Sequence, residues 1–261
     1  MLKTNIRNVL AQALNQRRFP VMLKKLWRRL VDDKGLLTKE ENLKWIQSHC
    51  SDFEALAKEL GPALWEDAEN FGKGADSKAE ETLRNIEYSL GGGAGISPFL
   101  YFVTRYMESN CIVETGVAAG YSSCAFLSAI KTTGKGRLYS SDFPYFRLPD
   151  PERLIGILVD ESLKDNWELY IDGDEKNLPR ILDKVDQIDI FHYDSDKSYS
   201  GRKFAMSAVK EKMNKNGLII MDDIQDNSYF HDYIKINEVP TWYIFKFAWR
   251  HVGVIGNLTT K

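Results

Sequence analysis

The sequence is poor in the features that mark several classes of protein. Its three cysteines, Cys50, Cys111 and Cys124, are an odd number without metal-type spacing, so we expect no disulfide framework and a reducing, cytoplasmic location. No apolar run approaches the ~20 residues of a membrane-spanning helix. Residues 1–30 lack the continuous apolar stretch of a signal peptide. Proline and glycine are too sparse for a long linker, and no internal repeat is present.

Net charge is also nearly absent, but its distribution is uneven. The 261 residues carry a formal charge of −2, which excludes a generally basic nucleic-acid binder. Residues 1–30 nevertheless hold eight Lys or Arg and no Asp or Glu, so the remainder carries −10. Such a basic amphipathic arm packs on its own domain, contacts another subunit or rests on an anionic membrane surface. We expect a homo-oligomer and leave the arrangement of the arm open.

The chain divides into a helical part and an alternating part. Residues 1–90 show helical patterns, with Thr38 and Glu41 spaced as a capping box, and a glycine-rich break follows. After residue 110, short β-rich runs alternate with helical patterns, which is typical of βα units and a mainly parallel sheet. These runs are 111–114, 137–142, 167–172, 188–194 and 217–223. Two final runs, 241–248 and 250–256, are almost contiguous and predict an antiparallel pair at the sheet edge.

We therefore predict an α/β fold. It is a Rossmann-like, doubly wound, mostly parallel sheet with an antiparallel C-terminal edge hairpin, preceded by an N-terminal helical extension. We place the extension at residues 1–95 and the ligand-binding domain at residues 96–261. Four of the five alternating runs end in an aspartate, and ligands of open α/β sheets bind at the carboxyl ends of strands. The row of carboxylates therefore indicates a site.

A glycine loop follows the first of these strands. Gly116 and Gly120 allow the backbone to approach a ligand, and the helix that begins at Tyr121 and Ser122 offers free N–H groups. Asp142 ends the next strand, 22 residues after Gly120, where a carboxylate can accept hydrogen bonds from ribose hydroxyls. The spacing is not that of a dinucleotide site, and no Walker lysine is present. The loop thus predicts a nucleoside ligand without pyrophosphate.

These residues resemble the class I S-adenosylmethionine-dependent methyltransferases. Glu114, Gly116 and Gly120 match the first motif of that family, and Asp142 matches the acidic residue of its second. The resemblance implies that residues 96–261 bind S-adenosylmethionine and that the helical extension serves oligomerisation or covers the acceptor. The residues implied to hold the cofactor are Glu114, Gly116, Gly120, Tyr121, Ser122, Asp142, Gly173, Asp174 and Asp194.

The resemblance is greatest to a bacterial branch with a strand that ends in Asp-Ser-Asp-His-Ser-Tyr and a later Asp-Asp-Ile. Residues 194–199 here read Asp-Ser-Asp-Lys-Ser-Tyr, so Lys197 replaces the histidine, and residues 222–224 read Asp-Asp-Ile. Relatives of this branch are associated with secondary-metabolite and surface-glycan pathways. The implied acceptor is therefore a small molecule or a sugar, and residues 143–149 and 226–230 are our candidates for contacting it.

Three aspartates fall at the ends of two strands that should be neighbours. Asp194, Asp222 and Asp223 would repel one another unless a cation or protons intervene, and hard oxygen ligands suit Mg²⁺ or another divalent ion. The arrangement resembles the metal site of catechol-type O-methyltransferases, whose pattern Asp-x-x-Lys fits Asp194 and Lys197. Asp223 stands where that group has Asn.

A mechanism follows as a hypothesis. A divalent ion on the acceptor hydroxyl would lower its pKa, Asp194 would help to hold that ion, and Lys197 would take the proton. Asp196 and Tyr199 are reserve candidates for the base or for substrate contact. The strand-end carboxylates could instead cap helices, Lys197 could be a solvated charge, and His192 fits a satisfied core residue. The competing functions are an NAD-type oxidoreductase and a non-catalytic methyltransferase-fold module of a biosynthetic complex.

Overall fold

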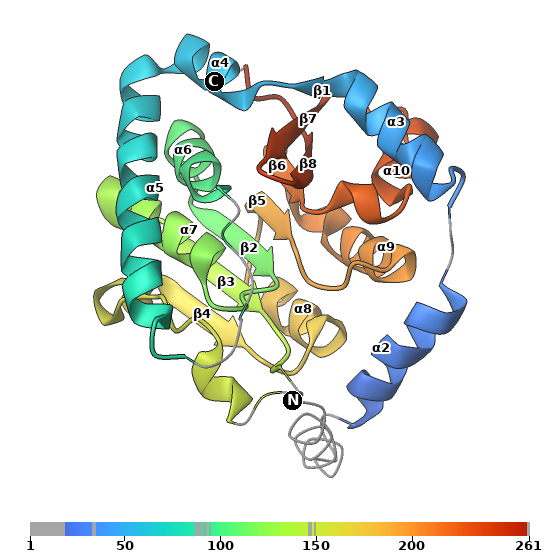
Figure 1. Cartoon of the computed structure of the whole chain (residues 1–261), viewed down its shortest axis with the longest axis horizontal. Helices are drawn as coiled ribbons and strands as arrows, with labels where there is room; N and C mark the ends of the chain where they lie inside the picture. The colour runs from blue at the N-terminus through green and yellow to red at the C-terminus, as the bar shows by residue number, and fades with distance from the viewer. Residues whose placement is uncertain are drawn as a thin grey trace.

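A mixed eight-stranded sheet forms the centre of the structure (Figure 1). In this computed structural model, residues 19–32, 35–86, 90, 93, 95–145, 148 and 150–259 are described. Neighbouring strands are parallel, except that β8 runs antiparallel to both β6 and β7. In spatial order the strands are β1 (Cys50–Ser51), β7 (Trp242–Phe247), β8 (Arg250–Ile255), β6 (Met213–Met221), β5 (Ile188–Tyr193), β2 (Cys111–Thr115), β3 (Arg137–Ser141) and β4 (Trp167–Tyr170).

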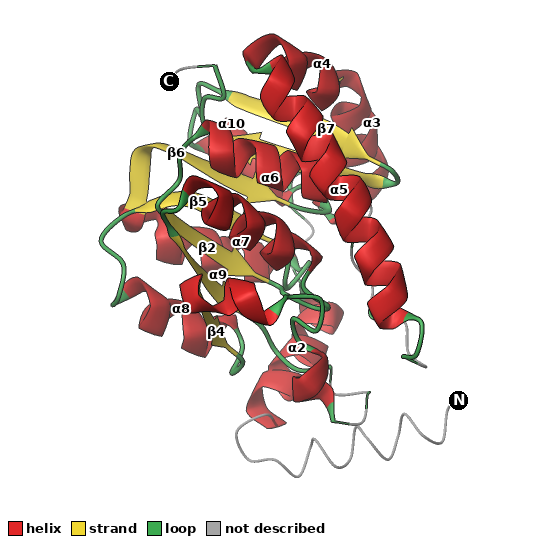
Figure 2. Cartoon of the chain, turned by 90° about the vertical axis from the view of Figure 1, so that its left-hand side faces the viewer, coloured by secondary structure: helices red, strands yellow, loops and turns green. Residues whose placement is uncertain are grey.

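Helices cover both faces of the sheet (Figures 1 and 2). One face carries α4 (Phe53–Leu60), α5 (Pro62–Leu83), α6 (Ser97–Tyr106) and α7 (Tyr121–Thr133). The other carries α3 (Lys39–His49), α8 (Asp174–Leu182), α9 (Tyr199–Val209) and α10 (Tyr229–Ile236). Helix α2 (Phe19–Val31) lies near α9 and contacts residues that follow β4 and β5. Short 3₁₀ helices are η1 (Pro151–Leu154), η2 (Glu161–Asn166), η3 (Lys210–Lys212) and η4 (Ile224–Asp226).

The inner strands are buried on both faces because helices cover both. In β2, Ile112 packs with α6 and α7 on one face, whereas the adjacent Val113 packs with the helices of the other face. Both side chains are fully buried. This explains why successive residues of these strands, such as Ile112 and Val113 in β2 and residues 218–221 in β6, are apolar instead of alternating with polar ones.

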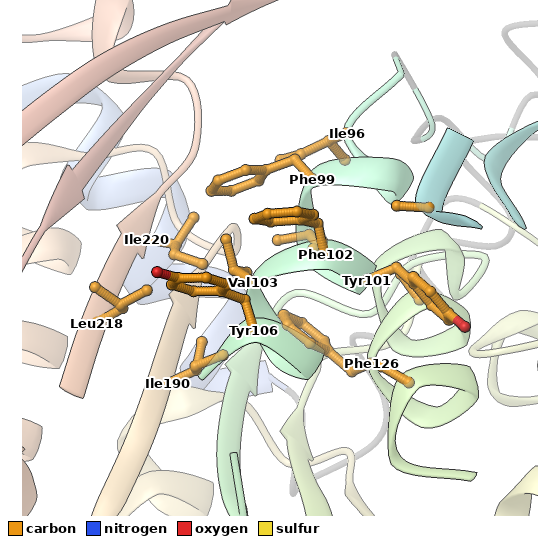
Figure 3. Close-up of a cluster of buried hydrophobic side chains, with 14 of the residues drawn as sticks. Ile96, Phe99, Tyr101, Phe102, Val103, Tyr106, Phe126, Ile190, Leu218 and Ile220 are labelled. Atoms are coloured by element: carbon orange, nitrogen blue, oxygen red, sulfur yellow. The ribbon is translucent and has the colours of Figure 1, made fainter. Parts of the chain in front are cut away.

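Helix α6 packs against one face of the sheet through aromatic side chains. Its rings of Phe102 and Tyr106 are stacked with centroids 5.6 Å apart. Figure 3 shows Tyr106 reaching toward Ile190, Leu218 and Ile220, which belong to the central strands β5 and β6. Stacked rings and aliphatic side chains together exclude water from this face of the sheet, and burial of this apolar area stabilises the fold.

The structure confirms the predicted fold class and corrects one local prediction. All seven predicted strands are present, and 241–248 and 250–256 form the antiparallel pair β7 and β8. Residues 50–51, however, are not helical. They form β1, which pairs in parallel with β7 and takes the outer edge of the sheet. The free backbone groups of β7 explain this, because an exposed edge readily accepts another strand.

The three cysteines are not paired. Burial raises the pKa of the Cys111 and Cys124 thiols to about 12, so neither is a thiolate nucleophile near neutral pH.

Among the described residues, no helix combines the length and apolar character that crossing a membrane requires.

Phe53 provides a test of how the helical segment before residue 95 is joined to the sheet. Its ring is 4% exposed and lies 4.6 Å from Phe99 and 5.1 Å from Phe245, measured between centroids. We expect Phe53→Ala to lower the free energy of unfolding by about 3–5 kcal/mol, because it leaves a cavity shared by α4, α6 and β7. Urea denaturation followed by circular dichroism would measure this loss.

The matched control is Leu43→Ala, which removes a more exposed apolar side chain from α3 and should change the unfolding free energy by less than about 1 kcal/mol. A shared core predicts a single unfolding transition. Two separate unfolding transitions, of which the one for the parallel strands is unaffected by Phe53→Ala, would show that the helical segment and the sheet do not share a core.

Candidate active site

A cavity of about 240 Å³ opens where β2, β3 and β5 end. Parallel strands bring their carboxyl ends to one side, so residues far apart in sequence meet there. Four residues predicted to bind the cofactor line this cavity, namely Gly116, Asp142, Asp174 and Asp194. The remaining lining residues are Ala118, Phe143, Pro144, Tyr145 and Ser195.

The glycine loop needs its glycines for steric reasons. Gly116 has φ +85°, and a Cβ there would lie 2.4 Å from the backbone oxygen of Asp194. Gly120 has φ +104° and precedes α7, which begins at Tyr121. A side chain at residue 116 would therefore separate the loop from the end of β5.

Asp142 fixes the loop that it faces. Its carboxylate accepts hydrogen bonds from the backbone N–H of Ala118 at 2.8 Å and from that of Phe143 at 2.6 Å. It lines the cavity at the end of β3, where a ribose-binding carboxylate was predicted. Phe143, Pro144 and Tyr145, predicted as acceptor contacts, line the same cavity, whereas residues 146, 147 and 149 lie outside the described part of the chain.

Glu114 lies beneath the loop and is completely buried. One carboxylate oxygen accepts hydrogen bonds from the hydroxyls of Ser123, at 2.6 Å, and Ser140, at 2.9 Å. The other lies 3.7 Å from Nδ1 of His192, which is buried in the middle of β5; neither ring nitrogen of His192 has a hydrogen-bond partner in the described part of the chain, so the prediction of a satisfied core residue is wrong. These contacts tie β2 to α7 and β3, so in this structure Glu114 supports the loop from below.

Asn177 is a site residue that sequence reasoning missed. Its side-chain amide donates to the Ser141 hydroxyl at 3.0 Å and to the Tyr170 carbonyl at 3.0 Å, and its oxygen accepts from the N–H of Asp172. This places Asp174 at the start of α8, where it accepts a hydrogen bond of 2.6 Å from the Ser141 hydroxyl. Asn177 belongs to no sequence motif, so nothing in the sequence signalled these contacts. Gly173, with φ +87°, precedes that helix.

The three predicted metal ligands do come together. Asp194 follows β5, and Asp222 and Asp223 follow β6, the neighbouring strand. One carboxylate oxygen of each lies within 4.8 Å of the others. Asp222 is buried, whereas Asp194 and Asp223 are partly accessible.

Two cationic side chains balance much of this negative charge. The ammonium group of Lys197 contacts Asp194 and lies 3.0 Å from Asp223. Arg250 lies 2.7 Å from the Asp222 carboxylate and 3.9 Å from that of Asp194. Burial lowers the pKa of Lys197 below its ordinary value, although the carboxylates beside it act in the opposite direction.

Arg202 and Arg250 are two further residues that sequence reasoning missed. Arg202 is almost completely buried and donates to the backbone carbonyls of Asp222, at 2.9 Å, and Asp223, at 2.8 Å. It thereby holds the turn after β6, in which Asp223 adopts φ +51°. Arg250 reaches the cluster because β8 is antiparallel to β6, so the start of β8 lies beside the end of β6. Neither arginine belongs to a local motif.

The donor set fits a divalent cation. Three carboxylates supply the hard oxygen ligands that Mg²⁺ prefers, and partial exposure of two of them leaves room for water or an acceptor hydroxyl. The Lys197 ammonium beside Asp194 and Asp223 shows that positive charge is favourable at this position.

Asp196 and Tyr199 point to other partners. The Asp196 carboxylate accepts a hydrogen bond of 2.9 Å from Arg28 of α2 and another from the N–H of Ser198. The Tyr199 hydroxyl donates to Asp232 at 3.1 Å. Both residues therefore face the N-terminal helices and α10 in this structure.

The part of the chain that carries these strand-end residues is similar to a known family. Residues 113–224 match the family model described as a methyltransferase domain, as the resemblance in the sequence predicted. This part of the chain is therefore similar to that methyltransferase domain family, and the Rossmann-like fold of the chain is one that solved methyltransferases share. Comparison with curated protein sequences finds no match.

Solved structures share this fold at low sequence identity. The O-methyltransferase TomG from Streptomyces achromogenes, involved in tomaymycin synthesis and solved with SAM, is 14% identical, with a TM-score of 0.55 over 70% of this chain and 89% of TomG. An O-methyltransferase from Bacillus cereus solved with SAH is 14% identical, with a TM-score of 0.51 over 81% of this chain and 100% of that one. A methyltransferase from Geobacter sulfurreducens is 17% identical, with a TM-score of 0.52 over 70% and 90%.

The ion pair between Arg250 and Asp222 can be tested through stability. We expect Arg250→Met to lower the free energy of unfolding by about 3–5 kcal/mol, because it leaves Asp222 buried without a charged partner. Asp222→Asn combined with Arg250→Met should lose less than the sum of the two single substitutions, since neither charge then remains alone. Urea denaturation of the four proteins of this double-mutant cycle measures the coupling. Additive losses would show that the two side chains act independently.

Proposed function

We propose that the protein is an S-adenosylmethionine-dependent O-methyltransferase that uses a divalent cation and acts on a hydroxyl of a small molecule or sugar. The observation that carries the proposal is the adjacency of two features. A nucleoside-sized cavity, with Asp142 and Gly116 in its lining, shares Asp194 with a cluster of three carboxylates. One carboxylate thus lies at both the methyl-donor side and the acceptor side of the site.

The methyl donor would be held by backbone and carboxylate groups. Asp142 would bind the ribose hydroxyls, and the loop that includes Gly116 and Ala118 would lie along the methionine part. Asp174, at the start of α8, faces the same cavity and would lie by the adenosine. Gly120, Tyr121 and Ser122 would contribute the N-terminus of α7, whose free N–H groups favour a carboxylate.

The acceptor hydroxyl would be positioned at the carboxylate cluster. Methyl transfer is an in-line displacement, so the chain must orient the acceptor oxygen and help remove its proton. Asp194, Asp222 and Asp223 would hold the cation, which when bound orients a hydroxyl and lowers its pKa. Lys197 lies within contact of two of these carboxylates, and once a cation takes over their charge, Lys197 as the neutral amine would accept the hydroxyl proton; Asp196 is the reserve candidate.

The substrate class is inferred from the chemistry of the site and from the sequence resemblance. A carboxylate cluster with access to solvent suits a polar hydroxyl-bearing acceptor better than an apolar one. The resemblance to a bacterial branch associated with secondary metabolites and surface glycans points to the same two acceptor classes.

Binding of the methyl donor can be tested at Asp142. We expect Asp142→Asn to weaken binding of S-adenosylmethionine by about tenfold or more, because it removes a charged acceptor of ribose hydrogen bonds. Isothermal titration calorimetry with the full chain measures this. The matched control is Asp172→Asn, which changes an exposed aspartate after the neighbouring strand β4 and should leave the affinity unchanged. Binding of NAD in place of S-adenosylmethionine would contradict the proposal.

The role of the cation can be tested at Asp194. We expect the unaltered protein to transfer methyl groups to hydroxyl acceptors, to lose this turnover in EDTA and to recover it with Mg²⁺. Asp194→Ala should weaken Mg²⁺ binding, measured by calorimetry, by about tenfold or more through loss of one anionic ligand. It is a cleaner probe than a change at Asp222, which would also leave Arg250 unpaired.

The control for this experiment is Asp226→Ala, which removes a nearby carboxylate that does not belong to the cluster. Its Mg²⁺ affinity should fall much less than that of Asp194→Ala, because Asp226 acts on the cluster only through its charge and not as a ligand. Full turnover in metal-free protein would show that the cluster does not act through a cation, even if methyl transfer itself is confirmed.

A further inference from the structure

Helix α2 presents two rows of side chains with opposite chemistry. Both rows repeat every four residues, so each follows one side of the helix. The row at 24, 28 and 32 continues one residue beyond the helix and is polar. The row at 19, 23, 27 and 31 is entirely apolar. Because the two rows lie on different sides of the helix, contact through one leaves the other uncovered.

The polar row attaches α2 to the rim of the active site. Lys24 lies 2.7 Å from Glu175, at the start of α8, and Arg28 contacts both Glu175 and Asp196. Asp32 accepts hydrogen bonds from two N–H groups at the start of α9, that of Tyr199 at 2.6 Å and that of Ser200 at 3.0 Å.

These contacts also orient the helix. Three attachments over two turns fix its rotation about its own axis, so the direction of the second row is set by the first. The Val21 side chain lies on the attached side, close to Gly173. Basic groups thus face an acidic surface of the protein, and the apolar row is turned outward.

The apolar row is exposed along its whole length. The exposed fractions are 44% for Phe19, 50% for Leu23, 65% for Trp27 and 57% for Val31. Together they make up four of the eight exposed large hydrophobic residues in the described part of the chain, and Leu36 lies shortly after them. A contiguous exposed apolar strip of this kind, unlike scattered single residues, marks a contact surface.

The charge of α2 distinguishes between the partners that could cover this strip. Its thirteen residues include four Lys or Arg and no Asp or Glu. Pairing with α2 of a second copy would therefore bring two strongly basic helices side by side, which is unfavourable. An anionic lipid surface provides an apolar layer for Leu23 and Trp27, and its negative charge attracts residues 1–30 as a whole, which hold eight Lys or Arg and no Asp or Glu. Aromatic residues such as Phe19 and Trp27 are also the types enriched at membrane interfaces.

We propose that the outward face of α2, formed by Phe19, Leu23, Trp27 and Val31, binds the protein to an anionic membrane surface. The helix would lie in the plane of the interface without crossing it. A cavity of about 150 Å³ lies between α2 and the start of α8, and Asp174 belongs both to its lining and to that of the predicted cofactor cavity. Membrane contact would therefore place the entrance of the proposed active site beside the lipid headgroups.

The test is co-sedimentation of the full chain with vesicles. Vesicles of phosphatidylcholine with about 30% phosphatidylglycerol are compared with phosphatidylcholine alone, because anionic lipid should be required. We expect the unaltered protein to bind the anionic vesicles and to be released by high salt. Leu23→Ser combined with Trp27→Ser should lower the partition coefficient by about tenfold or more, because two apolar side chains no longer insert. Both positions are exposed, so the two substitutions should leave the fold intact, and circular dichroism checks this.

The matched control is Ile236→Ser, which removes an equally exposed apolar side chain from α10 and should not change vesicle binding. Equal recovery of the unaltered protein and the double variant with anionic vesicles would overturn the proposal. The proposal would also be overturned if analytical ultracentrifugation without lipid detected a dimer of the unaltered protein that the double variant does not form. A second copy of the chain would then cover the strip. Neither result depends on catalysis. Membrane binding can therefore be confirmed even if the proposed methyl transfer is not, and methyl transfer can be confirmed even if membrane binding is not.

Discussion

The contact between Arg250 and Asp222 is the interaction on which the site depends. Parallel strands place carboxylates at one edge of the sheet, where their mutual repulsion opposes the fold. Strands β7 and β8 form an antiparallel hairpin, and β8 is also antiparallel to β6. Arg250, at the start of β8, therefore lies beside the end of β6, 2.7 Å from Asp222. The hairpin that ends the sheet therefore also supplies the charge that lets a buried aspartate remain there.

The N-terminal helices also contact the sheet and the strand-end site. β1 completes the sheet beside β7, and Phe53 packs between α6 and the strands. Farther toward the N-terminus, α2 attaches to the rim of the site through Arg28 and Asp32. The helical segment before residue 95 thus contacts the sheet at one edge, one face and the carboxyl ends, and it shares in both stability and the shape of the site.

The sheet and the aspartate cluster could be predicted because both follow from local pattern. β-rich runs alternating with helices imply parallel strands, and parallel strands bring their ends together, which is why Asp194, Asp222 and Asp223 meet. Arg202, Arg250 and Asn177 could not be predicted in the same way. Each acts on residues distant in sequence, through register and helix packing, and an arginine or asparagine without a motif carries no sign of its partner.

The close approach of Gly116 to Asp194 links the two proposed functions of the site, binding of the methyl donor and binding of a cation. With no room for a methyl group between residue 116 and the Asp194 carbonyl, the donor loop and the first carboxylate of the cluster share one rigid backbone contact. Any change to the proposed acceptor side that moves Asp194 must also move the loop proposed to bind the methyl donor. Altered acceptor preference in a redesigned enzyme is therefore best sought in residues outside this contact, such as those facing α2, where the backbone at the strand ends can stay in place.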